Sequence, residues 1–251
     1  MKKLLIILLL FTTTSFAYDP KNFNPDLWPY IQERMFGVRP VVVLDANDEL
    51  MVSGPIRASS GAQVPVNIKI NTERFVKIHL IIDSNPTQLA ATFKLTKNTQ
   101  NTEITTRIRM ETDSYVRVVG ETIRGELYTH KTGIRASGGC SGYMDVHDPE
   151  LTRDLGKILY KKKDNAHTTR IKHPMFTGLQ KDSINGWYVP EWIVKQVRYN
   201  FNGEIVLVVE NGISVSQDPY LKFNFSSEQS GTMIIKASDT KGQIFLKTLE
   251  L

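Results

Sequence analysis

Apolar and polar residues alternate with a period of two along most of the chain, which predicts β-strands with one buried face. The clearest case is residues 64–70, Val-Pro-Val-Asn-Ile-Lys-Ile, and residues 104–110 repeat the pattern. Turn-forming residues such as Asp-Ser-Asn-Pro at 83–86 separate the alternating runs and favour a β-sandwich. Further strands in this half are predicted at residues 75–82, 90–95, 115–121 and 127–130.

The second half of the chain shows the same alternation, with Asn202-Gly203 predicted to form a tight hairpin. Residues 145–154 are polar, contain a proline and do not alternate, as is typical of a linker. One helix is predicted at residues 26–36, with Asp26 as its N-cap. The strands of this half are predicted at 155–162, 168–172, 194–199, 204–209, 220–225, 232–238 and 243–249.

These elements predict an all-β protein with two sandwich domains in tandem, the first at residues 18–135 and the second at 154–251. Residues 136–153 are predicted to form a glycine-rich arm and a linker between them. The length of roughly 230 residues that follows the N-terminal segment fits either one large sandwich or two domains of about 110 residues each, and both can bury a core.

The N-terminus has the pattern of a secretory signal peptide at residues 1–17. Lys2 and Lys3 precede an apolar run, and Ser15-Phe16-Ala17 supplies small residues at the cleavage site. That run is too short to span a bilayer, and no later segment is long and apolar enough to do so. We therefore expect an exported, periplasmic protein without a membrane span.

The charge pattern argues against binding to nucleic acid. The formal net charge of +5 falls to +3 when Lys2 and Lys3 leave with the signal peptide. The one basic run, at residues 161–163, lacks interleaved aromatic residues, and a solvated strand edge explains it better.

Cys140 is the only cysteine, which excludes an intramolecular disulfide and a Cys-x-x-Cys redox motif. Its neighbours are too small to shield a thiol, so we expect an accessible sulfur on a flexible segment. A structural residue, a catalytic nucleophile and a covalent carrier site remain open. The glycines favour a carrier or intermolecular pairing, because a catalytic cysteine needs rigid geometry. The residues expected to give flexibility and access for partners are Ser137, Gly138, Gly139, Ser141 and Gly142.

The histidines do not point to catalysis or to a metal site. His130 and His147 lie closest to Cys140 in sequence, but neither belongs to a known nucleophile motif. His167 and His173 are six residues apart and have no carboxylate or thiol at ligand spacing. We expect all of them, with His79, to be ordinary surface residues, so no catalytic residue, metal or resident cofactor is predicted.

Two segments carry a resemblance to known sulfur-oxidation proteins. The run at 138–142, Gly-Gly-Cys-Ser-Gly, resembles the Gly-Gly-Cys-Gly-Gly arm of SoxY, the sulfur-carrying subunit of bacterial thiosulfate oxidation. Residues 173–182 and 213–223 resemble SoxZ, the latter through its Ser-Val-Ser-Gln-Asp-Pro-Tyr stretch. A chain with the SoxY-like segment first and the SoxZ-like segments after it is similar to the fused SoxYZ-like carriers that accompany quinoprotein dehydrogenases.

The resemblance implies two immunoglobulin-like sandwiches, SoxY-like and then SoxZ-like, in a carrier without turnover of its own. Cys140 would then hold oxidised or sulfane sulfur as a covalent adduct and present it to periplasmic sulfur-oxidation enzymes or a c-type cytochrome. Two departures bear on cargo and partners. The family arm ends its chain whereas this one is internal, and Ser141 stands where SoxY has glycine.

The alternative is an accessory or assembly protein for a periplasmic quinoprotein (PQQ) dehydrogenase, without sulfur cargo. In either case an exposed thiol in an oxidising compartment tends to find another, so a disulfide-linked dimer through Cys140 is a further expectation.

Overall fold

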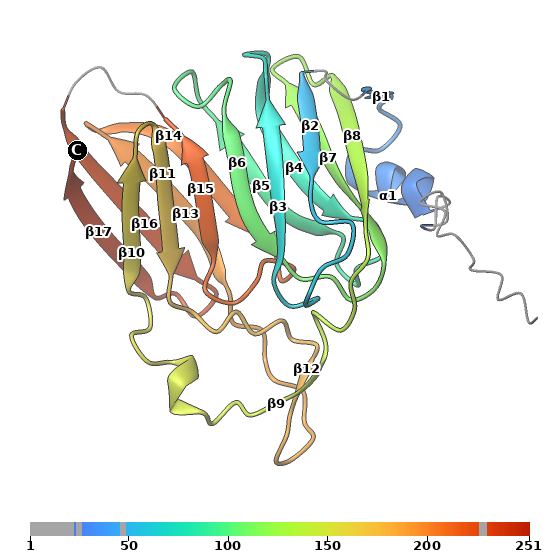
Figure 1. The fold of residues 1–251 in the computed structure, drawn as a ribbon, viewed down its shortest axis with the longest axis vertical. Helices are drawn as coiled ribbons and strands as arrows, with labels where there is room; N and C mark the ends of the chain where they lie inside the picture. Colours follow the sequence, from blue (N-terminus) through green and yellow to red (C-terminus); the bar gives the residue numbers. More distant parts are fainter. Residues whose placement is uncertain (1–22, 24–26, 46–48, 226–229) are drawn as a thin grey trace, which may run out of the picture.

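The computed structural model describes residues 23, 27–45, 49–225 and 230–251 (Figure 1). The predicted signal peptide at 1–17 and the predicted cap Asp26 lie outside these residues. In the described part of the chain, no helix has the length and apolar character needed to cross a membrane.

The all-β prediction is confirmed, with one short helix near the N-terminus. The first half contains α1 (Leu27–Phe36), β1 (Val41–Val43), β2 (Leu50–Ser53), β3 (Val64–Ile70), β4 (Phe75–Ile82), β5 (Leu89–Leu95), β6 (Glu103–Ile108), β7 (Ser114–Thr122) and β8 (Leu127–Ile134). The second half contains β9 (Gly142–Met144), the 3-10 helix η2 (Pro149–Leu151), β10 (Ile158–Lys163), β11 (Ala166–Ile171), β12 (Gln180–Asp182), β13 (Val194–Phe201), β14 (Glu204–Asn211), β15 (Tyr220–Asn224), β16 (Thr232–Asp239) and β17 (Ile244–Glu250).

Both large sheets run without interruption across the two halves of the chain. The nine-stranded sheet has the order β1-β8-β7-β4-β5-β14-β13-β16-β17, and the six-stranded sheet has the order β10-β11-β15-β6-β3-β2. The halves meet where β14 pairs with β5 and β15 pairs with β6, both antiparallel; Figure 1 shows β6 and β15 side by side. Each pairing gives hydrogen-bond partners to the backbone groups of a strand edge that would otherwise be open. Backbone hydrogen bonds therefore join the two halves, which also share one core.

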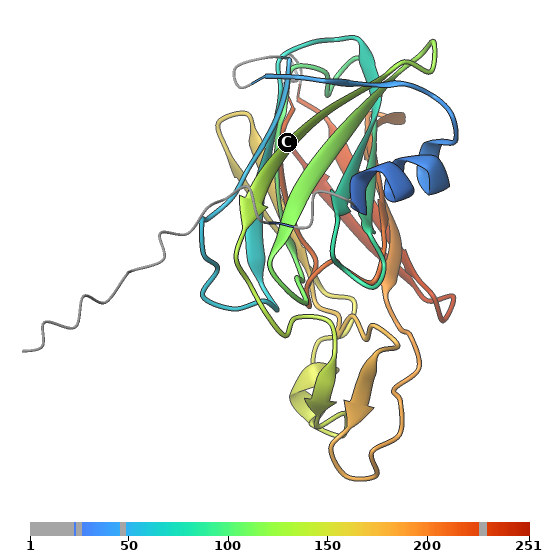
Figure 2. The same ribbon diagram turned by 90° about the vertical axis from the view of Figure 1, so that its right-hand side faces the viewer.

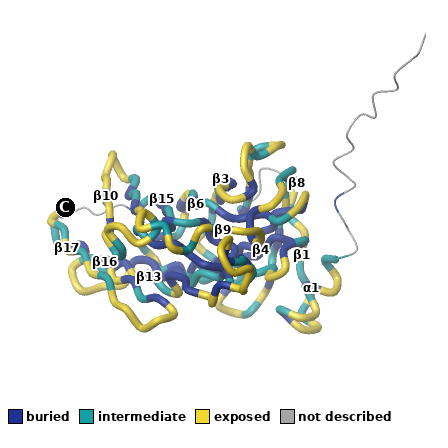
Figure 3. Tube along the Cα trace, turned by 90° about the horizontal axis from the view of Figure 1, so that it is seen from below, coloured by how far each residue is buried: buried dark blue, intermediate teal, exposed yellow. Residues whose placement is uncertain are grey.

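Strand alternation places one apolar face of each sheet in that core. In β3, Val64, Val66, Ile68 and Ile70 are buried while Lys69 is exposed. One buried cluster contains these residues together with Phe223 and others from the second half. Figure 3 shows the buried positions concentrated along the strands. At about 1.5–3 kcal/mol for each fully buried large side chain, this shared core fixes the two halves against each other.

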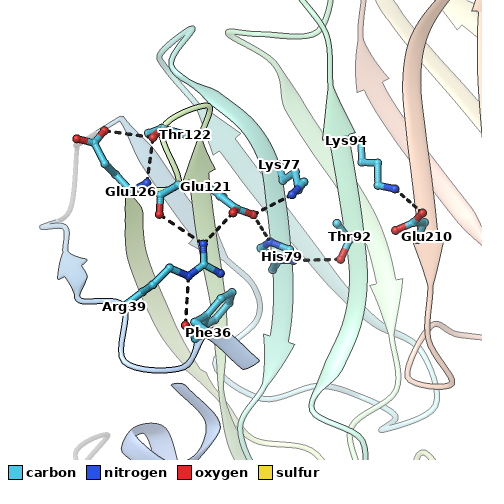
Figure 4. Close-up of polar contacts among 11 residues, drawn as sticks. Phe36, Arg39, Lys77, His79, Thr92, Lys94, Glu121, Thr122, Glu126 and Glu210 are labelled. Atoms are coloured by element: carbon cyan, nitrogen blue, oxygen red, sulfur yellow. Dashed lines mark hydrogen bonds and ion pairs between the residues drawn. The ribbon is translucent and has the colours of Figure 1, made fainter. Parts of the chain in front are cut away.

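The helix is tied to the outer face of the nine-stranded sheet by ion pairs (Figure 4). Arg39 donates to the carbonyl of Phe36 at the end of α1 and to Glu121 of β7 at 2.9 Å. Lys77 and His79 of β4 reach the same carboxylate at 3.2 and 3.4 Å. Burial alone would raise the pKa of Glu121, but these hydrogen bonds outweigh it and lower the pKa to about 2. The burial of His79 lowers its own pKa, so its ring is mainly neutral at pH 7.

A two-stranded parallel sheet extends below the sandwich (Figure 2). It pairs β9 with β12, joining Gly142 to Gln180 and Met144 to Asp182. The segment predicted as arm and linker therefore contains a strand and, at η2, a turn of 3-10 helix. As a result, the residues around Cys140 are anchored on one side by β8 and on the other by β9.

Candidate functional site

The backbone before Cys140 lies against the loop that joins β6 to β7. The amide of Gly138 donates to the carbonyl of Glu111 at 2.9 Å, and the amide of Gly139 donates to the carbonyl of Met110 at 3.0 Å. The amide of Met110 in turn donates to the carbonyl of Gly61, in the loop between β2 and β3, at 2.8 Å. Residues 138–140 are therefore part of a hydrogen-bonded layer. We call this arrangement the docked conformation.

Two glycines in this layer are needed for close approach. A Cβ at Gly139 would lie 2.1 Å from the carbonyl oxygen of Gly61, and a Cβ at Gly61 would lie 2.1 Å from that of Ser137. Gly138 and Gly142 differ, because they have positive φ angles of 67° and 105° and open space where a Cβ would stand. The glycines thus let the arm fit closely in the docked conformation. That they also give flexibility when it is released stays a prediction.

Glu111 holds the cysteine from the first half of the chain, and Thr177 holds it from the second. The Glu111 carboxylate accepts from the amides of Cys140 at 2.8 Å and Ser141 at 3.1 Å, and also from the Ser141 hydroxyl. Burial alone would raise the pKa of Glu111, but these three hydrogen bonds outweigh it and lower the pKa. The Thr177 hydroxyl donates to the Cys140 carbonyl at 2.8 Å. Cys140 therefore lies at the junction of the two halves.

The Cys140 thiol is buried, with only 1% of the residue exposed, so the prediction of an accessible sulfur is wrong for the docked conformation. The small neighbours do not shield it; side chains distant in sequence do. Burial raises the pKa of Cys140 to about 11, and the Glu111 charge adds to this, while Arg109 and a hydrogen bond with Ser214 oppose it. With that pKa, on the order of one molecule in 10,000 carries a thiolate at pH 7. The docked thiol is therefore a poor nucleophile.

Arg109 is, with Glu111, one of two charged residues near the sulfur that sequence reasoning missed. It is 4% exposed, and its Nη1 donates to the Met175 carbonyl at 2.5 Å. Burial lowers its pKa to about 10, and the Cys140 charge opposes this. Arg117, equally buried, has Asp83 at 2.7 Å, whereas Arg109 forms no ion pair with a carboxylate of the described residues and donates to a backbone carbonyl. A buried cation without a counter-charge is costly, so Arg109 favours an anionic sulfur next to it.

The histidines do not complete a catalytic arrangement with Cys140. His147 pairs with Asp182 at 3.1 Å, and the His130 ring accepts from the amide of Val52 at 3.1 Å. The prediction that His167 and His173 lie on the surface is wrong, because both are buried. Both histidines fall on the buried positions of the alternating pattern in the second half, so the sequence did contain a signal for their burial. Among the described residues, no group of three or more histidine, cysteine or acidic side chains is placed to hold a metal ion.

The comparisons with protein families match the two halves separately. The family model for sulfur oxidation protein SoxY matches residues 32–140, and that for sulphur oxidation protein SoxZ matches residues 160–250. The SoxY match thus ends at Cys140. Both are families of immunoglobulin-like sandwiches, which confirms the predicted fold class.

Among solved structures, the sulfur carrier protein SoxY from Chlorobium limicola f thiosulfatophilum matches with a TM-score of 0.39 and 21% identity, over 47% of this chain and 97% of that one. A superoxide reductase (neelaredoxin) from Ignicoccus hospitalis matches with a TM-score of 0.33 and 8% identity, over 39% and 94%. The fibronectin(III)-like modules of Clostridium thermocellum CbhA match with a TM-score of 0.25 and 10% identity, over 80% and 92%. No curated protein matches the sequence.

Proposed function

The chain belongs to the SoxYZ family of sulfur-oxidation carriers, with a SoxY domain followed by a SoxZ domain, and on this basis we propose that it carries sulfur covalently on Cys140 in the periplasm. The observation that carries the proposal is that the SoxY match ends at the only cysteine of the chain. That cysteine is held by Glu111 of the SoxY domain and Thr177 of the SoxZ domain.

The docked conformation supports a resting state in which the thiol is protected. Protonation and burial slow attack by other thiols and by oxidants, which matters for a lone cysteine in an oxidising compartment. Loading then requires release of the arm. Residues 135–141 join β8 to β9, and Cys140 lies two residues before Gly142, so a released arm can place it up to about 7 Å from the start of β9. Release therefore moves Cys140 away from its contacts with Glu111 and Thr177 and towards a partner enzyme.

In the proposed loading step the released Cys140 thiolate forms a sulfur–sulfur bond to a reduced sulfur anion. With thiosulfate as the example, thiolate and anion join as an S-thiosulfonate, and two electrons pass to a c-type cytochrome partner. The chain itself supplies the attachment point and the tether. Covalent tethering keeps the cargo from diffusing away between partners, so each later step is effectively intramolecular.

The test is a pulse and chase with sulfur-labelled thiosulfate in a periplasmic extract from the source cells. The wild-type chain is expected to gain label that reductant removes and that unlabelled thiosulfate displaces, whereas Cys140→Ser gains none. Equal labelling of wild type and Cys140→Ser would contradict the proposal, as would an unlabelled wild type in an extract that consumes thiosulfate.

The burial of the thiol favours one second candidate, an accessory protein for a quinoprotein dehydrogenase in which Cys140 carries no cargo. Under this reading the cysteine only fills space between the two domains. The test compares gene deletion with Cys140→Ser. If deletion abolishes dehydrogenase activity and complex formation while Cys140→Ser preserves both and no adduct forms on the wild type, the accessory function is correct. Loss of sulfur-dependent activity in Cys140→Ser rejects it.

A further inference from the structure

The small sheet of β9 and β12, which stands below the sandwich in Figure 2, carries a row of three side chains on one face. Lys181 of β12 pairs with Tyr143 of β9, and an isolated antiparallel bridge pairs Lys181 with Tyr188. Residues directly opposite each other on paired strands point to the same side of the sheet. Lys181 therefore lies between the two tyrosines. We call this row the aromatic face.

The opposite side of the small sheet is buried, whereas the aromatic face is open. Met144 and Val189 follow the two tyrosines in sequence and pack into a small apolar cluster with Trp192. Because side chains alternate along a strand, this packing turns Tyr143 and Tyr188 outward, where they are 70% and 65% exposed. Adjacent exposed aromatic side chains next to a built core are typical of an interaction surface.

Lys181 gives the aromatic face a positive charge at its centre. Its Nζ lies 5.9 Å from the centroid of the Tyr143 ring and 5.0 Å from that of Tyr188, within cation–π range of both. It forms no ion pair with a carboxylate in the part of the chain that the structure describes. Two aromatic anchors around an unpaired cation are complementary to an apolar protein surface that contains a carboxylate.

The hairpin that connects β12 to Tyr188 is held in one conformation. The Asp182 carboxylate accepts from the amide of Ile184 at 2.9 Å and from the side-chain amide of Asn185 at 2.6 Å, and it pairs with His147 at 3.1 Å. A surface that is already ordered loses little conformational entropy when a partner binds to it.

The short tether of Cys140 determines which partner covers this face. A released Cys140 stays within about 7 Å of Gly142, the first residue of β9, and Tyr143 is the next residue. A protein that takes the sulfur into its own active site therefore lies against β9. We propose that the aromatic face is the docking surface for the partner enzyme that loads Cys140, and that this enzyme presents an apolar patch with a carboxylate that pairs with Lys181. The identification of the partner as a loading enzyme rests on the proposed function.

The test is the initial rate at which Cys140 gains label from sulfur-labelled thiosulfate in a periplasmic extract of source cells that lack the gene, with the added chain at limiting concentration. Tyr143→Ser, Tyr188→Ser and Lys181→Glu are each expected to be labelled at least tenfold more slowly than wild type. Lys181→Arg keeps the charge and is expected to be labelled within about twofold of the wild-type rate.

Two exposed residues elsewhere on the molecule provide matched controls. Tyr30→Ser changes a tyrosine of α1 that is 60% exposed, and Lys236→Glu reverses an exposed charge on β16. Both are expected to keep the wild-type rate. Each labelling rate is divided by the rate at which iodoacetamide alkylates Cys140 in the same variant, so that an altered release of the arm does not count as altered docking.

The outcomes separate the docking surface from the carrier function. Slow labelling in all three face variants, with Lys181→Arg and both controls unaffected, supports the surface. A wild-type rate in either tyrosine variant or in Lys181→Glu overturns it and leaves the carrier function standing, as does an equal loss in the controls. A wild type that gains no label refutes the carrier function and the loading partner with it.

Two other occupants of the face are checked with the same variants. Light scattering would assign the face to a second copy if the wild type is a dimer that Lys181→Glu dissociates. Co-sedimentation with phosphatidylglycerol vesicles would assign it to a lipid surface if Tyr143→Ser abolishes the binding. Either result overturns the docking of an enzyme on this face.

Discussion

Removal of the Glu111 carboxylate is expected to release the arm and make Cys140 reactive. In Glu111→Ala the amides of Cys140 and Ser141 and the Ser141 hydroxyl all lose their acceptor in the docked conformation. Hydrogen bonds to a charged group contribute about 1.5–3 kcal/mol each when buried. Because Glu111 is only partly buried, we take about 1 kcal/mol for each of the two amide bonds. A loss of about 2 kcal/mol raises the released population roughly 30-fold.

The assay is the rate at which iodoacetamide alkylates Cys140 in the folded protein, followed by intact mass. The denatured chain gives the intrinsic rate, and Glu204→Ala, at the exposed first residue of β14, is the matched control. The expected result is a rate about 30-fold above wild type in Glu111→Ala and no change in Glu204→Ala.

Glu111 also raises the pKa of the docked thiol, so its removal alone would speed alkylation without release. Thr177→Val separates the two causes, because it removes the hydrogen bond to the Cys140 carbonyl without changing charge. Release predicts faster alkylation in both variants. An unchanged rate in Thr177→Val together with a rise in Glu111→Ala would refute the docking argument, as would unchanged rates in both.

The pH dependence follows from the same contacts. The pKa of Glu111 is lowered in the docked conformation, so the stabilisation that its carboxylate provides is present above its ordinary pKa. It is lost as the pH falls through the lowered pKa. Acidification therefore weakens docking, and alkylation rates corrected for the fraction of thiolate are expected to rise in that range.

Three further perturbations address separate parts of the structure. Gly139→Ala places a Cβ 2.1 Å from a backbone oxygen, so alkylation of Cys140 should accelerate at least tenfold. Gly138→Ala is the control, because its Cβ would stand in open space, and it should change the alkylation rate less. Equal alkylation rates in the two variants would contradict the close packing of Gly139 in the docked conformation. Arg109→Gln removes the cation that lowers the thiol pKa, so thiolate absorbance should appear at higher pH than in wild type, and a lower pKa would refute this role. Glu121→Gln should lose about 2–3 kcal/mol in urea unfolding at pH 7, because the difference between the folded pKa of about 2 and the ordinary 4.5 corresponds to about 3.4 kcal/mol, which solvent screening reduces. That difference should shrink as the pH falls from 4.5 towards 2, and a constant difference would refute it.

The strand pattern was predictable because it is local. Residues 64–70 alternate in sequence, and the structure forms β3 over the same span, since each side chain's face follows from its position along the strand. The two family resemblances were also carried by short local runs. The three-residue strands β9 and β12 were missed, because a pair this short leaves no period to detect.

The environment of Cys140 was not predictable, because residues far away in sequence create it. Glu111 is 29 positions before the cysteine, and Thr177 is 37 positions after it. Local reasoning saw only small neighbours and inferred exposure, whereas the small side chains allow the close approach that buries the thiol. Arg109 was overlooked because a polar residue in an alternating run normally faces solvent.

The measurement that tests the carrier function most directly is the intact mass of the protein purified without reductant from cells grown on reduced sulfur compounds. The account predicts a mass increment that peptide mapping places on Cys140, that reductant removes, and that is absent from Cys140→Ser. A wild-type chain that contains only free thiol under these conditions would contradict it.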